Sequence, residues 1–474
     1  MRFFRLFLLL LMVSYKVTGQ RITISEPLSI RNDYGYELLG RIKDRILVFR
    51  DRFDNFEIQA FDLELRATWN RELEDLEKRK AKVLAVIPGK NDFSVVYVER
   101  GKGKYMVRIH KYDPAAILID TATIKTYSER VFSPPEPELL KSEDRNTIAI
   151  YNSTEREVVE IACFRIDQMK LLWDTNTFIE KFSGERNVAH RSVSNEGDVY
   201  LVTEYENRKA KIEAHRFQLL RTGVSPEVLR DIAFPDALTS DVKFVIDQQR
   251  QVLTGAGLWS DKNKERANGV FFIRFDPNST NNDQLVKTPF DEQFVSVLKS
   301  KDIAEGDIKG IEDADVAQLI LREDGGVALI AEQHYEIQRG ATGSSRFTRD
   351  MRLIVDYYYD DVFLVSFSPE GVVQWRTILH KKQYSQDDEA IYSSWFLLRG
   401  RNEMQLMFND EIRYENTCSS YEVSATGRFD RSNLLNTADQ GLRLRFRDGI
   451  QLSANECIIP SEFRSRLKLV AIRF

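Results

Sequence analysis

The stretch Phe367-Ser-Pro-Glu-Gly-Val-Val-Gln-Trp375 contains the pattern that decides the fold. An apolar strand ends at an aromatic residue, a short polar turn follows, and the next strand carries a tryptophan. Pro and Gly mark a tight turn, and the aromatic and β-branched residues on either side favour strands. Similar corners lead from Phe61 to Trp69 and from Ile166 to Trp173. The repetition predicts a chain built from one recurring β-unit.

The spacing of these corners predicts the size of the unit. Successive corners are 51, 54, 51, 58, 92 and 56 residues apart, at Phe61, Tyr112, Ile166, Phe217, Phe275, Phe367 and Val423. A four-stranded propeller blade occupies roughly 40 to 50 residues, whereas helical repeats need an apolar stripe with a period of 3.6, which is absent here. The sequence therefore predicts an all-β fold, a β-propeller. Within the step of 92 we predict one further strand, Phe294–Leu298, and assign the excess to long loops.

The two ends of the chain predict how the ring closes. The next corner would fall about 51 residues after Val423, which is where the sequence ends, at Phe474. The last blade would then lack its fourth strand, and the alternating segment Arg21-Ile-Thr-Ile-Ser25 suits that position. Such pairing removes exposed strand edges. We predict eight four-stranded blades closed by the N-terminal strand; seven blades, with residues 437–474 packed differently, is the alternative.

Composition favours a folded protein whose core provides its stability. Of 474 residues, 68 are Lys or Arg and 73 are Asp or Glu, so the formal net charge is -5, and 42% are hydrophobic. This balance gives no general attraction to nucleic acid, and we expect no nucleic-acid partner. Three cysteines are too few for a disulfide scaffold. We expect Cys163 to be a buried thiol, and spacing leaves open whether Cys418 and Cys457 pair.

The first residues have the pattern of an export signal. Arg2 and Arg5 precede the apolar run Leu6–Val13, and small residues follow up to Gly19. The run is about half the length needed to cross a bilayer, which favours a cleaved signal peptide over residues 1–19. We therefore expect a single propeller domain over residues 20–474, without a transmembrane segment after cleavage. Its expected location is extracytoplasmic: periplasmic, on the cell surface or secreted.

Propeller topology places the connections on two faces. Connections between second and third strands and between blades share one face, which we call the loop-rich face, and the turns between third and fourth strands lie opposite. The first set is longer and more polar, so we expect it to carry function. It comprises Arg50–Asn55, Glu99–Lys104, Ser153–Glu157, Ser260–Asn268, Gln338–Asp350 and Asp410–Thr417, with inter-blade residues 131–139, 226–240 and 300–316.

Two segments on this face are the strongest binding candidates. The polar run Lys381–Glu389 is followed after one strand by Phe408-Asn-Asp410. Cations, amides and carboxylates near the ring axis would hold a peptide terminus or a glycan through partly desolvated hydrogen bonds, and a solvated loop is the alternative. The predicted ligand-binding residues are Lys381, Gln383, Asp387, Asp388, Asn409 and Asp410. Arg352–Phe367, with three tyrosines, is long enough to project as an extended hairpin.

No catalytic motif stands out in the sequence. The five histidines lack metal-ligand spacing, and neither a Gly-x-Ser-x-Gly elbow nor a cysteine–histidine signature is present. From the sequence we assign no catalytic residue, no metal and no cofactor. Adjacent carboxylates such as Asp360 and Asp361 would serve glycoside chemistry only at the right separation.

The corner Phe367–Trp375, with Lys381–Asp388 and Phe408-Asn-Asp410, resembles secreted propeller-type proteins of Bacteroidota that have no assigned activity. The turn leading to tryptophan also resembles the repeats of quinoprotein-like eight-bladed propellers, which include quinone dehydrogenases and outer-membrane assembly scaffolds. Those repeats usually keep Gly and Trp in most blades, whereas here only Gly371 with Trp375 matches fully. The adjacent cysteine pair of many quinone enzymes is missing.

Two functional hypotheses follow. The first is an exported, non-enzymatic binding or scaffold propeller that holds a protein partner or an extracellular polymer, such as a polysaccharide, on its loop-rich face. Such a protein would suit an envelope-associated complex. The second is a carbohydrate-active hydrolase or lyase with carboxylates near the ring axis.

Overall fold

The computed structural model describes residues 20–474 except 102, 129–134, 154–156, 183–185, 262, 300–309, 341–352, 411, 413–416 and 438–439. The predicted signal peptide, residues 1–19, lies outside the described residues, as do parts of the predicted loops around 131, 154, 300, 341 and 413.

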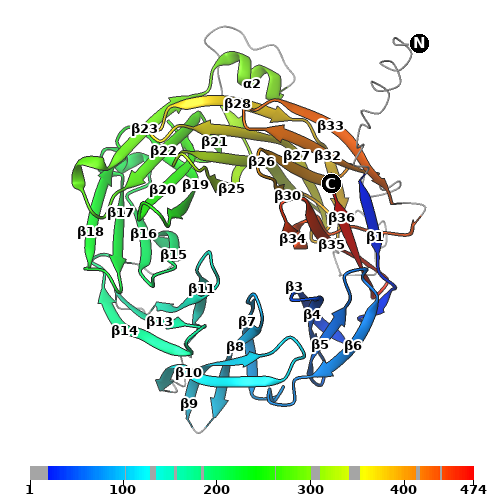
Figure 1. The fold of residues 1–474 in the computed structure, drawn as a ribbon. Helices are drawn as coiled ribbons and strands as arrows, with labels where there is room; N and C mark the ends of the chain where they lie inside the picture. The colour runs from blue at the N-terminus through cyan, green and yellow to red at the C-terminus, as the bar shows by residue number, and fades with distance from the viewer. Residues whose placement is uncertain are drawn as a thin grey trace, which may run out of the picture.

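The described chain forms an eight-bladed β-propeller, as predicted (Figure 1). Each blade has four antiparallel strands, from an inner to an outer one. Blade 1 contains β3 (Asp33–Ile42), β4 (Arg45–Arg52), β5 (Phe56–Phe61) and β6 (Ala67–Glu72), and blade 2 contains β7 (Ala81–Pro88), β8 (Phe93–Gly101), β9 (Lys104–Tyr112) and β10 (Leu118–Ser128). Blade 3 contains β11 (Glu138–Lys141), β12 (Thr147–Ser153), β13 (Val158–Arg165) and β14 (Lys170–Phe178). Blade 4 contains β15 (Val188–Val193), β16 (Val199–Tyr205), β17 (Arg216–Thr222) and β18 (Val228–Ala233).

The second half of the ring repeats this arrangement. Blade 5 contains β19 (Leu238–Asp247), β20 (Val252–Ser260), β22 (Gly269–Phe275) and β23 (Gln284–Pro289), and blade 6 contains β25 (Ala314–Leu321), β26 (Val327–Gly340), β27 (Leu353–Phe367) and β28 (Val373–Leu379). Blade 7 contains β30 (Trp395–Arg399), β31 (Glu403–Asn409), β32 (Thr417–Ser424) and β33 (Phe429–Asn436). Blade 8 contains β34 (Ile450–Ser453), β35 (Glu456–Phe463), β36 (Arg466–Arg473) and β1 (Arg21–Ile24).

The ring closes as predicted, by a strand from each end of the chain. β1 pairs antiparallel with β36, with Ile22 opposite Ile472. Beyond β1, Ser25 donates its N–H to the Leu469 carbonyl (2.9 Å) and accepts the Leu469 N–H on Oγ (2.8 Å). The pairing continues through β2 (Leu28–Ser29). Eight blades, rather than the alternative of seven, follow from this shared sheet.

Two of the three tryptophans of the repeated corner tie neighbouring blades together. Trp375 donates its indole N–H to the Ala425 carbonyl of blade 7 (3.0 Å), and Trp173 donates to the Gly197 carbonyl of blade 4 (2.8 Å). Gly371 has a φ of +79°, and a Cβ there would lie 2.7 Å from the Phe272 ring, so the turn itself requires glycine. In blades 3 and 6 the corner therefore joins one blade to its neighbour.

One predicted corner is wrong. Phe217 lies at the start of the third strand of blade 4, and the corner follows Thr222 at the other end of that strand. The connection before this strand contains a 3-10 turn, η2 (Lys209–Ala214), so the strand begins later in the sequence than predicted. Phe217 is fully buried against Phe234, and an aromatic core residue fits either end of a strand.

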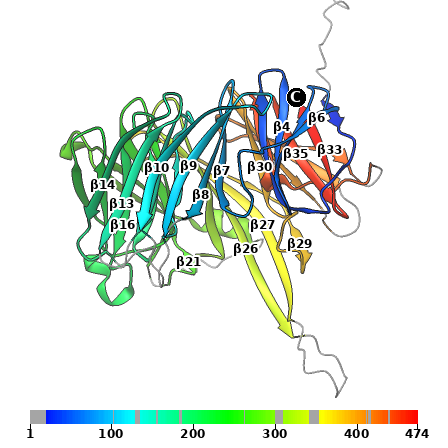
Figure 2. The ribbon, with the colours of Figure 1, turned by 90° about the horizontal axis from the view of Figure 1, so that it is seen from below.

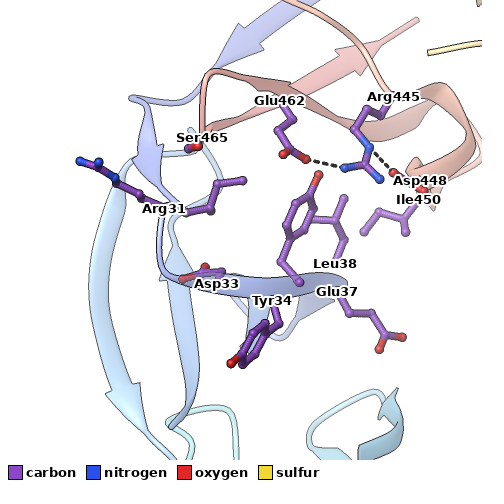
Figure 3. A pocket seen from close by; sticks show the side chains of 13 residues that line it. Arg31, Asp33, Tyr34, Glu37, Leu38, Arg445, Asp448, Ile450, Glu462 and Ser465 are labelled. Carbon is purple, nitrogen blue, oxygen red and sulfur yellow. Dashed lines mark hydrogen bonds and ion pairs between the residues drawn. The ribbon is translucent and has the colours of Figure 1, made fainter. Parts of the chain in front are cut away.

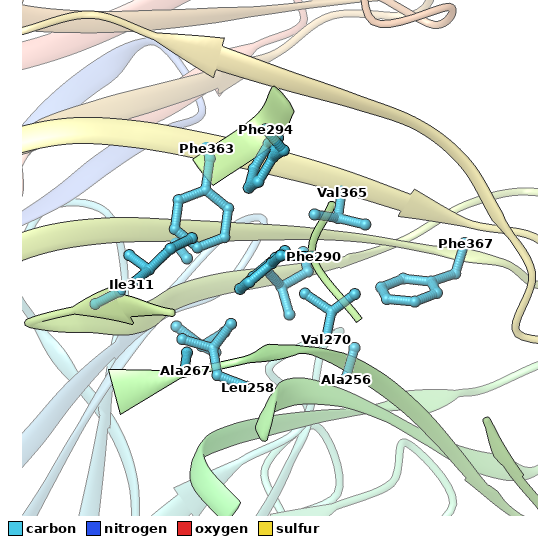
Figure 4. Close-up of a cluster of buried hydrophobic side chains, with 14 of the residues drawn as sticks. Ala256, Leu258, Ala267, Val270, Phe290, Phe294, Ile311, Phe363, Val365 and Phe367 are labelled. Atoms are coloured by element: carbon cyan, nitrogen blue, oxygen red, sulfur yellow. The ribbon is translucent and has the colours of Figure 1, made fainter. Parts of the chain in front are cut away.

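The predicted strand Phe294–Leu298 is also wrong, because this segment lies in helix α2 (Glu292–Lys299). Asp291 caps the helix by accepting the Phe294 N–H on Oδ1 (2.8 Å). Phe294, Val295 and Leu298 have a spacing that also fits one helix face, and they are buried. Phe294 packs edge-on against Phe363 of β27, so the helix covers the core between blades 5 and 6 (Figure 4).

The extended hairpin is confirmed, since β26 and β27 continue beyond blade 6 and project from the ring (Figure 2). We call residues 334–340 and 353–359, together with β29 (Gln383–Gln386), the arm; β29 pairs with β27 along it. Tyr358 stacks on Tyr335 with ring centres 4.7 Å apart, and its ring lies 5.2 Å from that of Tyr384. Tyr358 therefore packs within the arm.

The three cysteines are buried free thiols. Cys418 and Cys457 lie in one apolar cluster between blades 7 and 8, yet they do not form a disulfide. The core thus holds the fold without covalent cross-links. Within the described part of the chain, no helix has the length and apolar character that crossing a membrane requires.

Deleting residues 20–29 tests how much the shared blade stabilises the ring. The deletion exposes the edge of β36 and removes the apolar contacts of Ile22, Ile24 and Leu28, so the free energy of unfolding should fall by at least about 3 kcal/mol. Aggregation should rise with protein concentration. Urea denaturation and light scattering measure both, with Glu26→Ala, an exposed change in the same segment, as the control. Unchanged stability would contradict this role.

Candidate functional site

A cavity of about 580 Å³ on the loop-rich face lies between blades 8 and 1 (Figure 3). We call it the blade 8–1 cavity. Its walls come from the start of β3, the end of β35 and the connection before β34, which contains a 3-10 turn, η5 (Phe446–Asp448). The start of β3 lies more than 400 residues from the other two segments in sequence, and it meets them only because the ring closes.

Arg445 is the central charged group of this cavity. Its guanidinium contacts two carboxylates: Nε lies 2.5 Å from Asp448 Oδ2, and Nη1 donates to Glu462 (Figure 3). The phenol of Tyr36 lies beside the guanidinium, with the ring centre 5.8 Å from Arg445 Cζ. Burial raises the pKa of Tyr36, against the opposing effect of Arg445, so the phenol stays neutral. Its hydroxyl is buried and has no hydrogen-bond partner among the described residues.

A buried ion network fixes the start of β3, where the cavity begins. Arg50 donates from Nε to Asp33 Oδ2 (2.7 Å) and from Nη1 to Glu57 Oε1 (2.8 Å). Its Nη2 also donates to the Ser29 carbonyl of β2 (2.7 Å), so the closing segment belongs to the same network. The side chains of Arg50, Asp33 and Glu57 are at most 6% exposed. This wall of the cavity is therefore held in place before any ligand binds.

Two exposed aromatic side chains stand beside the cavity. Tyr34 is 67% exposed and Phe53 is 69% exposed, and their ring centres are 5.9 Å apart. Lys78 Nζ lies 5.2 Å from the Tyr34 ring centre, within range of a cation–π interaction. A second hollow of about 380 Å³ lies around this pair and shares Arg31, Asp33 and Tyr34 with the blade 8–1 cavity. The two hollows are therefore adjacent.

Three of the predicted ligand-binding residues belong to a buried internal network. Lys381 Nζ lies 2.7 Å from Glu332 Oε1 and donates to Gln383 Oε1 (3.0 Å); the Lys381 and Glu332 side chains are 1% and 6% exposed. Gln383 Nε2 donates to the Asn409 carbonyl (2.7 Å). Asn409 Nδ2 in turn donates to the Leu444 carbonyl (2.8 Å). These side chains join blades 6, 7 and 8.

The three predicted aspartates lie nearer the surface. Asp387 is exposed, and its Oδ1 accepts the Val355 N–H (2.9 Å). Asp388 is half-buried and accepts the Ala390 N–H on Oδ1 (3.0 Å). Asp410 pairs with Arg431 and accepts the Ser419 hydroxyl. Asp387 and Asp388 are thus the predicted residues best placed to meet a ligand.

The predicted polar segment lies next to the blade 8–1 cavity. Tyr392, just after it, donates its hydroxyl to the Glu462 carbonyl (2.9 Å), and the Glu462 carboxylate faces the cavity. Arg447, on the same connection as Arg445, lies 4.6 Å from the ring centre of Tyr359 at the base of the arm. Sequence reasoning found this neighbourhood but missed Tyr34, Tyr36, Arg445 and Glu462, which carry no local motif. Phe53 alone lay in a predicted loop, Arg50–Asn55.

A smaller cavity of about 310 Å³ lies at the base of the arm. Asp313 and Asp360 line it together with Tyr335. Burial raises the pKa of both carboxyls; Glu312 adds to the effect at Asp313, whereas Lys382 and Lys381 oppose it at Asp360. Across the described ranges, no group of three or more His, Cys, Asp or Glu side chains has an arrangement suited to a metal ion.

Three solved structures of similar shape share little sequence with this chain. The Dos1 propeller is 8% identical and covers 95% of each chain, with a TM-score of 0.45. A europium-containing methanol dehydrogenase is 10% identical over 96% of this chain and 93% of its own, with a TM-score of 0.42. Dipeptidyl peptidase 4 of Porphyromonas gingivalis is 12% identical over 92% of this chain and 56% of its own, with a TM-score of 0.43.

No family model and no curated protein matches the chain. The three TM-scores are below 0.5, so the assignment of eight blades rests on the observed sheets and their pairing.

Replacing Lys381 by methionine should destabilise the fold by about 3 to 5 kcal/mol, because it leaves the buried Glu332 carboxylate without its partner. Adding Glu332→Gln should recover most of that loss, since no buried charge then remains. Urea denaturation of both variants measures the effect. A loss below about 1 kcal/mol for Lys381→Met would show that the pair does not stabilise blades 6 to 8.

Proposed function

We propose that the protein is an exported, non-enzymatic binding propeller whose loop-rich face holds a segment of a protein partner. The observation that carries the proposal is the exposed pair Tyr34 and Phe53 beside the blade 8–1 cavity. Exposed aromatics next to a hollow with fixed polar groups are typical of the energetic centre of protein interfaces. The rigid wall supplied by Arg50 would lower the entropic cost of binding.

A protein segment fits this surface better than a polysaccharide does. The two rings are tilted by 42° to one another, so they do not form one flat platform on which successive sugar rings would stack. The adjacent cavity, about 580 Å³ in volume, is large enough to receive a single side chain from an extended segment. Asp387 and Asp388, in the connection between blades 6 and 7, would contact the same partner.

Replacing both Tyr34 and Phe53 by alanine should weaken binding of partner peptides at least about tenfold, because the substitution removes the aromatic contact area. Peptides selected from a random phage-displayed library on wild-type protein serve as probes, measured by biolayer interferometry. The double variant Val224→Ala/Val372→Ala removes two comparably exposed apolar side chains on the opposite face and should bind as wild type. Equal affinity of all three proteins, or no selected peptide, would contradict the proposal.

Asp387→Ala/Asp388→Ala tests the predicted polar segment in the same assay. Both carboxylates make hydrogen bonds near the surface, so the melting temperature should change little, whereas affinity for the selected peptides should fall. Peptide affinity equal to that of wild type would remove these two residues from the binding face. Retention of the protein on insoluble polysaccharides, lost with Tyr34→Ala/Phe53→Ala, would instead favour an extracellular polymer as the partner.

A second function, carbohydrate hydrolysis or elimination, is favoured by one observation at the base of the arm. Asp313 and Asp360 line the same cavity, and a carboxyl with a raised pKa is what a general acid requires. If this function operates, purified protein should release reducing ends from a polysaccharide panel, and Asp313→Asn or Asp360→Asn should each lower the rate at least about 100-fold. Glu336→Gln, an exposed carboxylate on the arm that does not line this cavity, is the control. No release from any polymer would reject this function.

A further inference from the structure

One edge of the arm has no strand beside it among the described residues. On that side, the pairing between β25 and β26 ends where the His334 N–H donates to the Asp313 carbonyl (2.8 Å). Beyond His334, β26 pairs with β27 alone in the described part of the chain, and it continues away from the ring (Figure 2). Residues 336–339 are exposed. We call residues 335–339 of β26 the free edge.

The backbone groups of Glu336 and Gln338 point outward along the free edge. His334 directs its N–H toward β25, and alternate residues of a strand point the same way, which places Glu336 and Gln338 on that side. The other side of the arm agrees. Val355, which lies opposite Gln338, directs its carbonyl away from β26 to the Asp387 N–H (3.0 Å). Two residues of the free edge therefore present N–H and C=O groups that a further strand would bond.

The arm is held as a rigid sheet, so the free edge keeps the shape of a strand. The Asp356 carboxylate, which is 3% exposed, joins all three strands of the arm. It accepts hydrogen bonds from Arg339 on β26, and from the Tyr384 hydroxyl (2.8 Å) and Gln386 Nε2 (3.1 Å) on β29. An edge that is ordered in advance loses little conformational entropy when another strand pairs with it.

The free edge is complementary to itself when a second copy runs antiparallel to it. With Glu336 opposite Gln338 of the second copy, outward groups meet outward groups, and each such pair exchanges two main-chain hydrogen bonds. The Gln338 amide also donates to the Glu336 carboxylate, so the negative charge meets a donor. Ile337 lies opposite Ile337 of the second copy, and the aliphatic stem of Arg339 packs on the opposed Tyr335 ring.

The neighbouring registers fit less well. Sliding one copy by two residues in one direction places Glu336 opposite Glu336, and like charges directly opposite each other destabilise a pair of strands. Sliding it by two residues in the other direction places the apolar side chain of Ile337 opposite the charged Arg339. The charges of the free edge therefore favour a single register.

We propose that two copies of this chain associate by pairing their free edges antiparallel, with the twofold axis at Ile337. The two arms then form one continuous sheet, in which main-chain hydrogen bonds supply affinity and side chains fix the register. The contact is small, so we expect a weak dimer that forms as the protein concentration rises. This inference goes beyond the proposed function and is independent of it, because no residue that lines the blade 8–1 cavity takes part.

Sedimentation velocity of the protein comprising residues 20–474 tests the association. Between about 1 and about 300 µM, the wild type should shift from monomer toward dimer. Gln338→Pro should weaken the dimer at least about tenfold, because it removes an N–H that each copy donates across the interface and leaves the bonds to β27 intact. Gln338→Ala keeps that N–H and should dimerise within about threefold of wild type. A monomer at every concentration, or a dimer unaffected by Gln338→Pro, would overturn the inference.

A second variant separates loss of the interface from damage to the arm by proline. Ile337→Lys keeps every backbone N–H and places two ammonium groups opposite each other at the axis, so it should also weaken the dimer at least about tenfold. Its melting temperature should stay near that of wild type, since Ile337 is 43% exposed. Dimerisation of Ile337→Lys at the wild-type level would overturn the inference.

A cysteine at the axis tests the register. Opposed residues whose backbone groups point away from each other have Cα atoms about 4.5 Å apart, within the range of a disulfide. Ile337→Cys should therefore give a covalent dimer on mild oxidation, whereas Gln338→Cys, opposite Glu336, should give little. The three native cysteines are buried. Equal yields from the two variants, or no linked dimer from Ile337→Cys, would contradict the proposed pairing.

Another occupant of the free edge would give a different result. A protein that stays monomeric, yet binds phage-selected peptides that Gln338→Pro no longer binds, would show that the edge takes a segment of another protein and would overturn the dimer. The dimer should form equally in Tyr34→Ala/Phe53→Ala, so failure of the proposed function would leave this inference standing.

Discussion

The pairing of β1 with β36 is the interaction on which the rest of the structure depends. It completes blade 8 from the two ends of the chain and removes the strand edges that an open ring would expose. It also builds the blade 8–1 cavity, because β2 continues the pairing and its Ser29 carbonyl accepts from Arg50, which in turn fixes Asp33 at the start of β3. Ring closure and the candidate site are thus parts of one continuous network.

Much of the fold could be predicted because a propeller is periodic. The spacing of apolar corners gave the blade size, and the position of Phe474 relative to Val423 identified the missing strand. Phe217 and Phe294 were misplaced for a shared reason: a buried aromatic side chain marks core contact but does not indicate which end of a strand it occupies, or whether the segment is a strand at all. In Phe294–Leu298 the capping Asp291 is the local signal that favours a helix.

The candidate site was less accessible to sequence reasoning. The polar segment beginning at Lys381 was located on the correct face, yet the burial of Lys381, Gln383 and Asn409 depends on contacts with Glu332 and Leu444 in other blades, which spacing does not reveal. Tyr36 and Arg445 are ordinary residues in sequence. They become neighbours only because blades 8 and 1 meet when the ring closes. There the Tyr36 ring lies beside the Arg445 guanidinium, which also contacts the carboxylates of Asp448 and Glu462.

A cysteine cross-link measures the closure most directly. In the variant Ile22→Cys/Ile472→Cys, built together with Cys457→Ala because Cys457 also lies opposite position 472, the two thiols stand opposite each other in the β1–β36 ladder. Mild oxidation should therefore join them, and mass spectrometry of the digested protein should recover the linked peptides. Ile22→Cys/Leu467→Cys, whose second position pairs with Leu28, should stay unlinked under the same conditions. Absence of the first cross-link, or equal yields from both pairs, would contradict a ring closed in this register.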